Sequence, residues 1–288
     1  MTTPTHNPTA HLPDSPPAPA SLSPGTQHPR PGDPPAIDIQ HLTVSYGRIA
    51  ALLDVTLQIQ PGTLVGVIGP NGSGKSTLIK SLLGLVRPDV GSVRIFGQPA
   101  SEAKARIAYV PQRSTVDWDF PITVRQVARM GRYAHVPFYK GLSKQDRAIA
   151  DHALELVRMT DFRHRQIGEL SGGQQQRVFM ARALAQGADI LLLDEPFAGV
   201  DAATERAILD VLDRLRTSGK TLLVVHHDLA TAAEYFDQLA LLKQRLYGFG
   251  TPRAVLHADL LAEVYEGDPR TFLPLAIPAD PADPHTPR

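Results

Sequence analysis

The stretch that decides the fold is Leu64-Val-Gly-Val-Ile-Gly-Pro-Asn-Gly-Ser-Gly-Lys-Ser-Thr77. Its apolar beginning, 64–68, is typical of a strand buried in a parallel sheet. The phosphate-loop pattern GxxxxGK[ST] follows in Gly69, Pro70, Asn71, Gly72, Ser73, Gly74, Lys75, Ser76 and Thr77. A helical apolar pattern comes next, so the motif has the strand–loop–helix context that it requires. The sequence therefore predicts a nucleoside triphosphate site.

The residue types in this loop suit a phosphate group. Glycines let the backbone curl so that several N–H groups face one anion, and the following helix adds the positive end of its dipole. Lys75 adds a full charge, and the hydroxyl of Ser76 is an oxygen ligand of the kind that Mg²⁺ prefers. The alternative is an ordinary glycine turn before a helix. It is disfavoured because the full pattern arises by chance in roughly 1% of chains of this length.

Strand and helix patterns alternate around the loop. Apolar alternation indicates strands with one wet face at 37–46 and 55–59, and short apolar runs indicate buried strands at 64–68, 107–110, 190–193 and 222–225. Helical periodicity occurs at 78–86, where it stops before Arg87-Pro88, and at 153–157 and 204–215, while Thr251-Pro252 is a good helix start. This order predicts an α/β core with a parallel sheet covered by helices on both faces.

Proline marks the expected limits of the folded part. Of the 26 prolines, 11 fall in residues 1–35 and six in 269–288. Segments rich in proline and poor in large apolar residues do not bury enough surface to offset the entropy of ordering. We therefore expect disordered tails at 1–35 and 267–288 and one folded domain at 36–266. Within it, about 113–170 lacks strong strand runs and is expected to be a mostly helical insertion.

Composition excludes several classes of protein. Lys+Arg and Asp+Glu are both 29, and this zero formal net charge argues against a protein held to nucleic acid by phosphate neutralisation. Cysteine is absent, which excludes disulfides and thiolate sites. No apolar run approaches the roughly 18 residues of a membrane span, and no apolar signal segment precedes Arg30. We expect a soluble, cytosolic chain that reaches a membrane only through a partner.

Two adjacent acids end the apolar run Ile190-Leu-Leu-Leu-Asp-Glu195. A buried strand delivers Asp194 to the carboxyl edge of the sheet, where the phosphate loop also lies. Asp194 is then expected to hold Mg²⁺, and Glu195 to orient or deprotonate the attacking water. Capping of a following helix is the alternative role for such acids, and the nearby phosphate loop disfavours it.

A second anion site is indicated by Leu170-Ser-Gly-Gly-Gln174, which precedes the helical run QQRVFMARAL. A hydroxyl, two glycines and a helix N-terminus repeat the physics of the phosphate loop. One chain cannot use two such sites on one γ-phosphate. LSGGQ with these neighbours resembles the signature motif of ATP-binding cassette (ABC) ATPases, and the resemblance covers about residues 37–266.

The resemblance implies a P-loop NTPase fold with a RecA-like parallel-sheet core, an antiparallel β part and a helical subdomain. It also implies a head-to-tail homodimer in which the signature of one copy, Ser171, Gly172, Gly173 and Gln174, closes on ATP and Mg²⁺ bound by the other copy. Tyr46 resembles the aromatic that stacks on adenine. Gln112 resembles the Q-loop glutamine that reaches Mg²⁺ and senses the membrane partner. Asp201, in Ala198-Gly-Val-Asp, resembles the D-loop acid at the dimer seam.

A histidine that contacts the γ-phosphate should follow the run 222–225, where two adjacent histidines stand. Successive strand residues point to opposite faces, so both cannot reach one phosphate. The family pattern has histidine directly before aspartate, and Asp228 follows His227. We therefore assign the role to His227 and expect His226 to pack on the other face.

The stretches PQRSTVDWDFPITV and DEPFAGVDAATE resemble the branch of importers for manganese, zinc and iron. That branch implies a peripheral subunit on the cytoplasmic face of the cell membrane, bound to integral permease subunits and acting indirectly with an extracytoplasmic solute-binding protein. No nucleic-acid partner is expected. The alternatives are the ATPase of a siderophore or haem importer and a soluble ABC ATPase that acts on DNA or ribosomes. The single phosphate loop, single signature and lack of a long heptad run disfavour the soluble ATPase.

Five aromatic residues gather in 22 positions, namely Trp118, Phe120, Tyr133, Phe138 and Tyr139. Two interpretations stay open at this point. These side chains fill the core of the helical insertion, or some of them line a groove that accepts a short helix from a membrane subunit.

Overall fold

The computed structural model describes residues 34–137 and 139–272. Its centre is a six-stranded sheet in the order β10-β9-β3-β8-β7-β6. All neighbouring strands run parallel except the antiparallel pair β9–β10. The bounds are β3 Leu64–Ile68, β6 Ile107–Val110, β7 Ile190–Asp194, β8 Thr221–Val225, β9 Gln238–Lys243 and β10 Arg245–Gly250.

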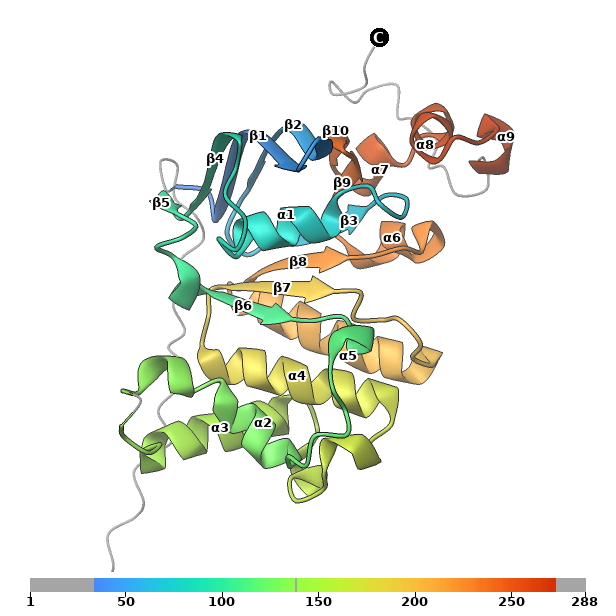
Figure 1. Ribbon diagram of the computed structural model, residues 1–288. Helices are drawn as coiled ribbons and strands as arrows, with labels where there is room; N and C mark the ends of the chain where they lie inside the picture. Colours follow the sequence, from blue (N-terminus) through green and yellow to red (C-terminus); the bar gives the residue numbers. More distant parts are fainter. Residues whose placement is uncertain (1–33, 138, 273–288) are drawn as a thin grey trace, which may run out of the picture.

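A second, antiparallel sheet covers one face of the first, with the helix α1 (Lys75–Leu82) between them (Figure 1). Its order is β2-β1-β4-β5, with bounds β1 Ile37–Tyr46, β2 Ile49–Ile59, β4 Val90–Ile95 and β5 Gln98–Pro99. The expected parallel sheet and antiparallel part are thus confirmed. The prediction that helices cover both faces of the parallel sheet holds only in part for this face, because α1 shares the cover with apolar side chains of β1 and β2.

Helices cover the opposite face of the parallel sheet (Figure 1). Side chains alternate along its strands. In β7, Leu191 and Leu193 face the helical core, while Ile190 and Leu192 face the core under the antiparallel sheet. The helices on this side are α4 Gly172–Gln186 and α5 Ala202–Thr217, and α6 Leu229–Tyr235 follows β8. The continuous apolar runs of these strands therefore reflect burial on both faces.

The region 113–170 contains α2 (Val124–Met130) and α3 (Lys144–Leu156), joined by short 3-10 turns. Both helices pack against α4. Two hydrogen bonds from Arg125 to the carboxylate of Asp151 link α2 to α3, one from Nε at 2.8 Å and one from Nη2 at 2.5 Å. Among the described residues, this region has no strand pairing beyond the isolated bridge Thr123–Gln166, which agrees with the helical pattern of its sequence.

Two boundaries differ from the sequence prediction. The helix expected to reach Val86 ends at Leu82, because Gly84 adopts a left-handed φ of +64° and turns the chain. At the C-terminal end, α7 Pro252–Val255 and α8 Ala258–Tyr265 are followed by a short helix, α9 Pro269–Phe272, whose Phe272 packs on Tyr265. The folded part therefore extends past 266. The remainder of both expected tails lies outside the described residues.

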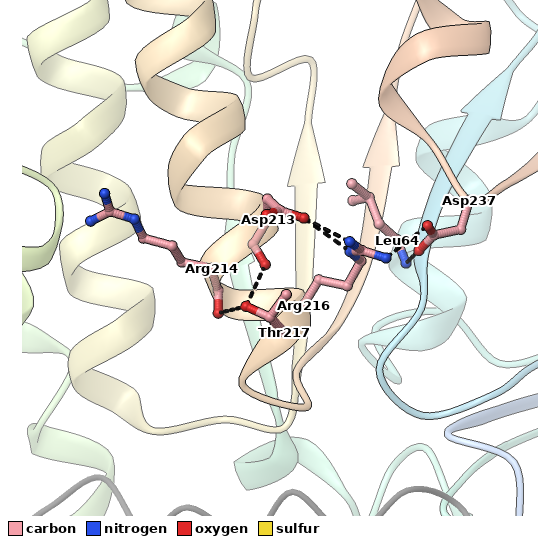
Figure 2. A network of polar contacts seen from close by, with 6 residues as sticks. All are labelled: Leu64, Asp213, Arg214, Arg216, Thr217 and Asp237. Atoms are coloured by element: carbon pink, nitrogen blue, oxygen red, sulfur yellow. Dashed lines mark hydrogen bonds and ion pairs between the residues drawn. The ribbon is translucent and has the colours of Figure 1, made fainter.

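An ion-pair network fastens the edge of the parallel sheet at which the strands begin (Figure 2). Arg216, near the end of α5, donates to Asp237 at 3.0 Å and to Asp213 at 2.7 Å. The other carboxylate oxygen of Asp237 accepts the backbone N–H of Leu64 at 2.9 Å. This network therefore joins α5 to the first residue of β3, at the end of the strand away from the phosphate loop.

Candidate functional site

The phosphate loop connects β3 to α1 and is gripped by neighbouring backbone. A Cβ on Gly69, where φ is +148°, would lie 2.0 Å from the carbonyl oxygen of Leu242 in β9. A Cβ on Gly74, where φ is +100°, would lie 2.5 Å from the carbonyl oxygen of Ala51 in β2. Only glycine fits either position. The two glycines thus let the loop lie directly on two strands from different sheets.

Lys75 is buried at the start of α1, and its ammonium group lies under its own loop. Its Nζ donates to the carbonyl oxygens of Gly69 and Pro70, both at 2.8 Å. Burial lowers the pKa of Lys75, and the negative charges of Glu195 and Asp194 act in the opposite direction. A cation held in this way supplies a fixed charge at the mouth of a loop whose glycine backbone is free of side chains.

The two acids end β7 beside this lysine. Burial raises the pKa of Asp194, and the adjacent charge of Glu195 raises it further, whereas Tyr109 and Lys75 oppose the shift. Glu195 itself takes a left-handed φ of +49°, which is rare for a residue with a side chain. Such strain is typical of sites where function constrains the backbone.

Gln112 follows β6, the strand next to β7, and its amide Nε2 donates to Glu195 Oε2 at 2.8 Å. The structure therefore brings together two residues that lie 83 positions apart in the sequence. Ser76 is exposed at the first turn of α1. Oxygen donors from Ser76, Gln112 and Asp194 are the ligand type of Mg²⁺, so the residues fit that ion.

The histidine pair follows β8, and its two members differ in burial. His226 is 2% exposed and packs among Phe197, Tyr235 and Phe236, with Nε2 2.8 Å from the hydroxyl of Thr231. Burial lowers the pKa of His226 to about 4. His227 is exposed. The burial of His226 agrees with a packing role, although its ring centre lies 5.9 Å from that of His227. The assignment of the γ-phosphate contact to the exposed His227 stays a prediction.

The signature residues form a second cluster at the N-terminus of α4. Ser171 caps the helix, since its hydroxyl accepts the N–H of Gln174 and the Gln174 side chain accepts the N–H of Ser171. Among the residues that the structure describes, none accepts a hydrogen bond from this hydroxyl. A Cβ on Gly173 would lie 2.1 Å from a methyl carbon of Thr204, next to the α5 N-cap Asp201. Ser171 and Asp201 therefore stand on neighbouring helix starts, both exposed.

Tyr46 lies at the end of β1 and is 50% exposed. No contact joins it to the phosphate loop among the described residues, although β2, its partner strand, touches Gly74 through Ala51. An exposed aromatic ring at this place leaves a face open for stacking.

Sequence reasoning missed Tyr109. Its hydroxyl donates to Asp194 at 3.4 Å, and burial together with the charge of Asp194 raises the pKa of Tyr109 to about 12. The signal was present, because β6 and β7 pair in parallel and a polar tip inside the apolar run Ile107–Val110 needs a partner. The ring is held as a neutral donor.

Comparison with known protein families agrees with the geometry of this site. A model of the family "ABC transporter" matches residues 52–198, from β2 through the acids of β7. The chain belongs to the ABC transporter family. It carries the ABC ATPase domain of an ATP-binding transporter subunit, as expected from the phosphate loop and the signature motif.

Two relatives with names of metal transport proteins match most of the chain. The manganese transport system ATP-binding protein MntB of Bacillus subtilis is 51% identical over 80% of this chain and 92% of its own length. The zinc transport system ATP-binding protein TroB of Treponema pallidum is 50% identical over 81% of this chain and 87% of its own length.

Solved structures share the fold of this ABC protein. An inward-facing transporter described as metal-chelate type is 28% identical, with a TM-score of 0.73, over 81% of this chain and 89% of its own. A dimeric ATP-binding cassette with bound ADP and phosphate is also 28% identical, with a TM-score of 0.65, over 75% of this chain and 99% of its own.

Proposed function

We propose that this chain is the ATP-hydrolysing subunit of an ABC importer for a transition-metal ion, namely manganese, zinc or iron. The single observation that carries the ATPase role is the pairing in one chain of a phosphate loop on β3–α1 with a separate signature cluster on α4. The choice of cargo rests on the manganese and zinc relatives, which are about half identical over four fifths of the chain.

ATP binding is assigned to the phosphate loop, residues Gly69 to Thr77. Lys75 would turn from its own carbonyl oxygens to the β- and γ-phosphates, to which the backbone N–H groups of the loop also donate. Tyr46 would stack on the adenine, for which its half-exposed ring is suited. We assign Ser76, Gln112 and Asp194 to hold Mg²⁺, which when bound neutralises phosphate charge.

Hydrolysis is assigned to the edge residues of β7 and β8. Glu195 would accept a proton from the attacking water, and its hydrogen bond from Gln112 orients the carboxylate. His227 would contact the γ-phosphate from the exposed end of β8. His226 stays neutral near pH 7, because its pKa is about 4, and so adds no charge next to His227.

Two copies would close head to tail, so that the signature Ser171, Gly172, Gly173 and Gln174 of each completes the nucleotide site of the other. Asp201 would lie at the seam, beside the signature to which Thr204 ties it. A dimeric relative of the same fold supports this arrangement. Each nucleotide would bridge both copies, and hydrolysis would remove the bridge.

The permease would bind a groove of about 480 Å³ on the helical region, lined by Ile122, Met130, Tyr133, Leu142, Arg129 and Arg147. Met130 and Tyr133 are 45% and 58% exposed there, and Phe120 and Tyr139 are also exposed. Trp118 instead packs edge-on against Phe179, 5.3 Å between ring centres. The aromatic residues therefore divide between the two interpretations, and Phe138 lies outside the described residues. A short apolar helix of a membrane subunit fits this surface.

A peripheral position on the cytoplasmic face of the membrane follows from this partnership. Among the described residues, no helix is both long and apolar enough to span a bilayer. Likewise, the described part of the chain holds no cluster of three His, Asp or Glu side chains suited to a metal ion. Cargo would therefore be selected by the permease and an extracytoplasmic solute-binding protein.

Uptake in a strain that lacks this chain tests the proposal. We expect the wild-type chain to restore uptake of labelled manganese or zinc, and the Glu195→Gln variant to fail at equal abundance. Restoration of iron–siderophore or haem uptake alone would instead identify a chelate importer, the cargo class suggested by one structural neighbour. Co-purification with ribosomes or DNA, and not with a polytopic membrane protein, would contradict the importer.

A further inference from the structure

Arg113 connects the segment after Gln112 to the signature helix. Its guanidinium Nε donates to the side-chain oxygen of Gln175 at 2.8 Å. The same planar group covers Gly172, because a Cβ on that glycine would lie 3.1 Å from the guanidinium carbon. Arg113 therefore touches the first turn of α4 at two places, one a hydrogen bond and one a face contact.

The point of attachment on α4 is fixed. Gln175 is 3% exposed, and its amide nitrogen donates to the carbonyl oxygen of Ile167 at 3.1 Å. Both polar atoms of this buried side chain are thus engaged, one by Arg113 and one by the turn that precedes the signature. A buried, fully bonded amide of this kind transmits displacement, because moving either partner leaves it unsatisfied.

A second contact ties the same segment to α4. The indole N–H of Trp118 donates to the carbonyl oxygen of Arg113 at 2.9 Å, and the Trp118 ring packs on Phe179. At its other end the segment begins with Gln112, which is bonded to Glu195. The seven residues 112–118 therefore link the candidate base, through Gln112, to the signature helix.

The signature glycines are held from both sides. Arg113 lies against Gly172, and Thr204 of α5 lies against Gly173, where its hydroxyl also donates to Asp201 at 2.9 Å. The Thr204 contact fixes the signature relative to the helix start at the expected dimer seam. The Arg113 contact fixes it relative to the segment that leaves the nucleotide site.

We propose that Arg113 is a positioning residue that couples the Gln112 segment to the signature motif, so that it sets the anion site which this copy offers to its partner's nucleotide. This inference rests on the proposed dimer. A planar guanidinium is needed because only it combines the Nε hydrogen bond with face contact on the glycine, which an ammonium group cannot do. Arg113 thus acts in its own chain on chemistry in the other copy.

The first test uses the Glu195→Gln protein, in which ATP should bind without being hydrolysed, so that the closed dimer accumulates. We would compare it with the same protein carrying Arg113→Gln or Arg113→Lys, and measure dimer formation against ATP concentration by size-exclusion chromatography. Arg94→Gln, at a remote exposed position of β4, is the matched control. Thermal unfolding checks that each variant is folded.

We expect Arg113→Gln to raise the ATP concentration needed for dimerisation about 10-fold or more, as for a lost hydrogen bond to a charged group. Arg113→Lys should fall between it and the parent. Binding of a fluorescent ATP analogue to the monomer should stay within about twofold, because Arg113 has no contact with the phosphate loop among the described residues. Equal losses in monomer binding and dimerisation would overturn the inference.

Mixed dimers give the sharper test. In one, Arg113→Gln and Lys75→Ala are in the same copy, so the intact phosphate loop of the other copy faces the altered signature. In the other, the two substitutions are in opposite copies, so the intact loop faces an intact signature. We expect ATP retention, measured on the Glu195→Gln background, to fall only in the first.

Loss in the second mixed dimer alone, or equal loss in both, would overturn the inference and place the effect of Arg113 on its own copy's nucleotide. Failure of the parent Glu195→Gln protein to dimerise at any ATP concentration would overturn the proposed dimer itself, and the inference with it. The two failures are therefore distinguishable.

Discussion

The parallel sheet has one edge formed by the beginnings of its strands and another formed by their ends, and the two differ in how charged groups are paired. At the edge where the strands begin, charged groups are paired within the chain: Arg216 bonds Asp237, and Arg106 bonds Asp189 at 2.7 Å (Figure 2 shows the first pair). At the edge where the strands end, Asp194 and Glu195 stand next to each other, and burial moves the pKa of Asp194 up and that of Lys75 down.

This difference separates stability from chemistry. Paired groups at the first edge need nothing further, whereas the second edge keeps like charges adjacent and a lysine partly desolvated. Perturbed pKa values of this kind concentrate at functional sites, because a ligand supplies the missing partner. Substitutions where the strands end should therefore change nucleotide binding or hydrolysis, whereas substitutions where the strands begin should change only stability.

Glu195→Gln should have the largest effect. Removing the proton acceptor should lower the ATPase turnover number by about 100- to 10,000-fold, while ATP binding is kept. Steady-state hydrolysis together with equilibrium nucleotide binding checks this. If the variant turns over normally, Glu195 is not the base and the chemistry of this edge is misassigned.

Lys75→Ala should come next. Loss of charged hydrogen bonds to phosphate is worth about 1.5–3 kcal/mol, so ATP affinity should fall about 10- to 100-fold. Lys80→Ala, which changes an exposed lysine one turn and a half along the same helix, is the control. A titration of both with a fluorescent nucleotide would contradict the assignment if they lost affinity equally.

Asp194→Asn should stabilise the nucleotide-free protein against unfolding, while it abolishes ATP hydrolysis. The folded state raises the pKa of Asp194, so the charged form is disfavoured on folding and stability falls as pH rises through that pKa. Neutralising the group should raise the free energy of unfolding near pH 7 by about 0.5–1 kcal/mol, allowing for partial solvent screening. Denaturant unfolding of the variant and the parent measures this difference. A lower free energy of unfolding for the variant would contradict the contrast between the two edges.

His226 should give the protein a pH-dependent stability. Its pKa is about 4 in the folded state, below the usual 6.5, so between these values the unfolded chain binds more protons. Stability should therefore be intact above pH 7 and lost on acidification, by about 2 kcal/mol between pH 7 and pH 5. His226→Phe keeps a ring in the aromatic cluster and should flatten this part of the profile. An unchanged slope would show that other groups cause it.

Asp237→Asn should have the smallest effect and should act on stability alone. The amide oxygen can still accept from Leu64, and only the charge facing Arg216 is lost, which for a partly exposed pair is worth about 0.2–1 kcal/mol. Unfolding in urea and ATPase assays check both halves of the statement. A loss of turnover above twofold would mean that the two edges are coupled.

Much of the site was predictable because its motifs are contiguous. The phosphate loop and the signature are each a short glycine-containing segment that leads directly into a helix, so local sequence determines them. Strand alternation predicted that only one of His226 and His227 reaches the phosphate, and the resemblance to the family pattern, in which histidine directly precedes aspartate, selected His227. The apolar runs identified β3, β6, β7 and β8 because burial on both faces removes polar residues.

Other features depend on what lies opposite in space. The early end of α1 follows from Gly84, since the apolar periodicity itself continues to Val86. The cover over one sheet face depends on how β1 and β2 fold back. The bond from Arg113 to Gln175 joins residues 62 positions apart, with no shared pattern in the sequence. Side-chain pairs of this kind become visible only when both backbones are placed.

The backbone contacts that support the phosphate loop have a consequence for folding of the chain during translation. Gly69 rests on the carbonyl of Leu242, and the carbonyl of Ser73 accepts the N–H of Gln244, whose own carbonyl accepts the N–H of Leu53. The motif is translated early, but its support arrives some 170 residues later. A nascent polypeptide on the ribosome should thus remain unable to capture nucleotide until β9 and the turn after it have left the exit tunnel.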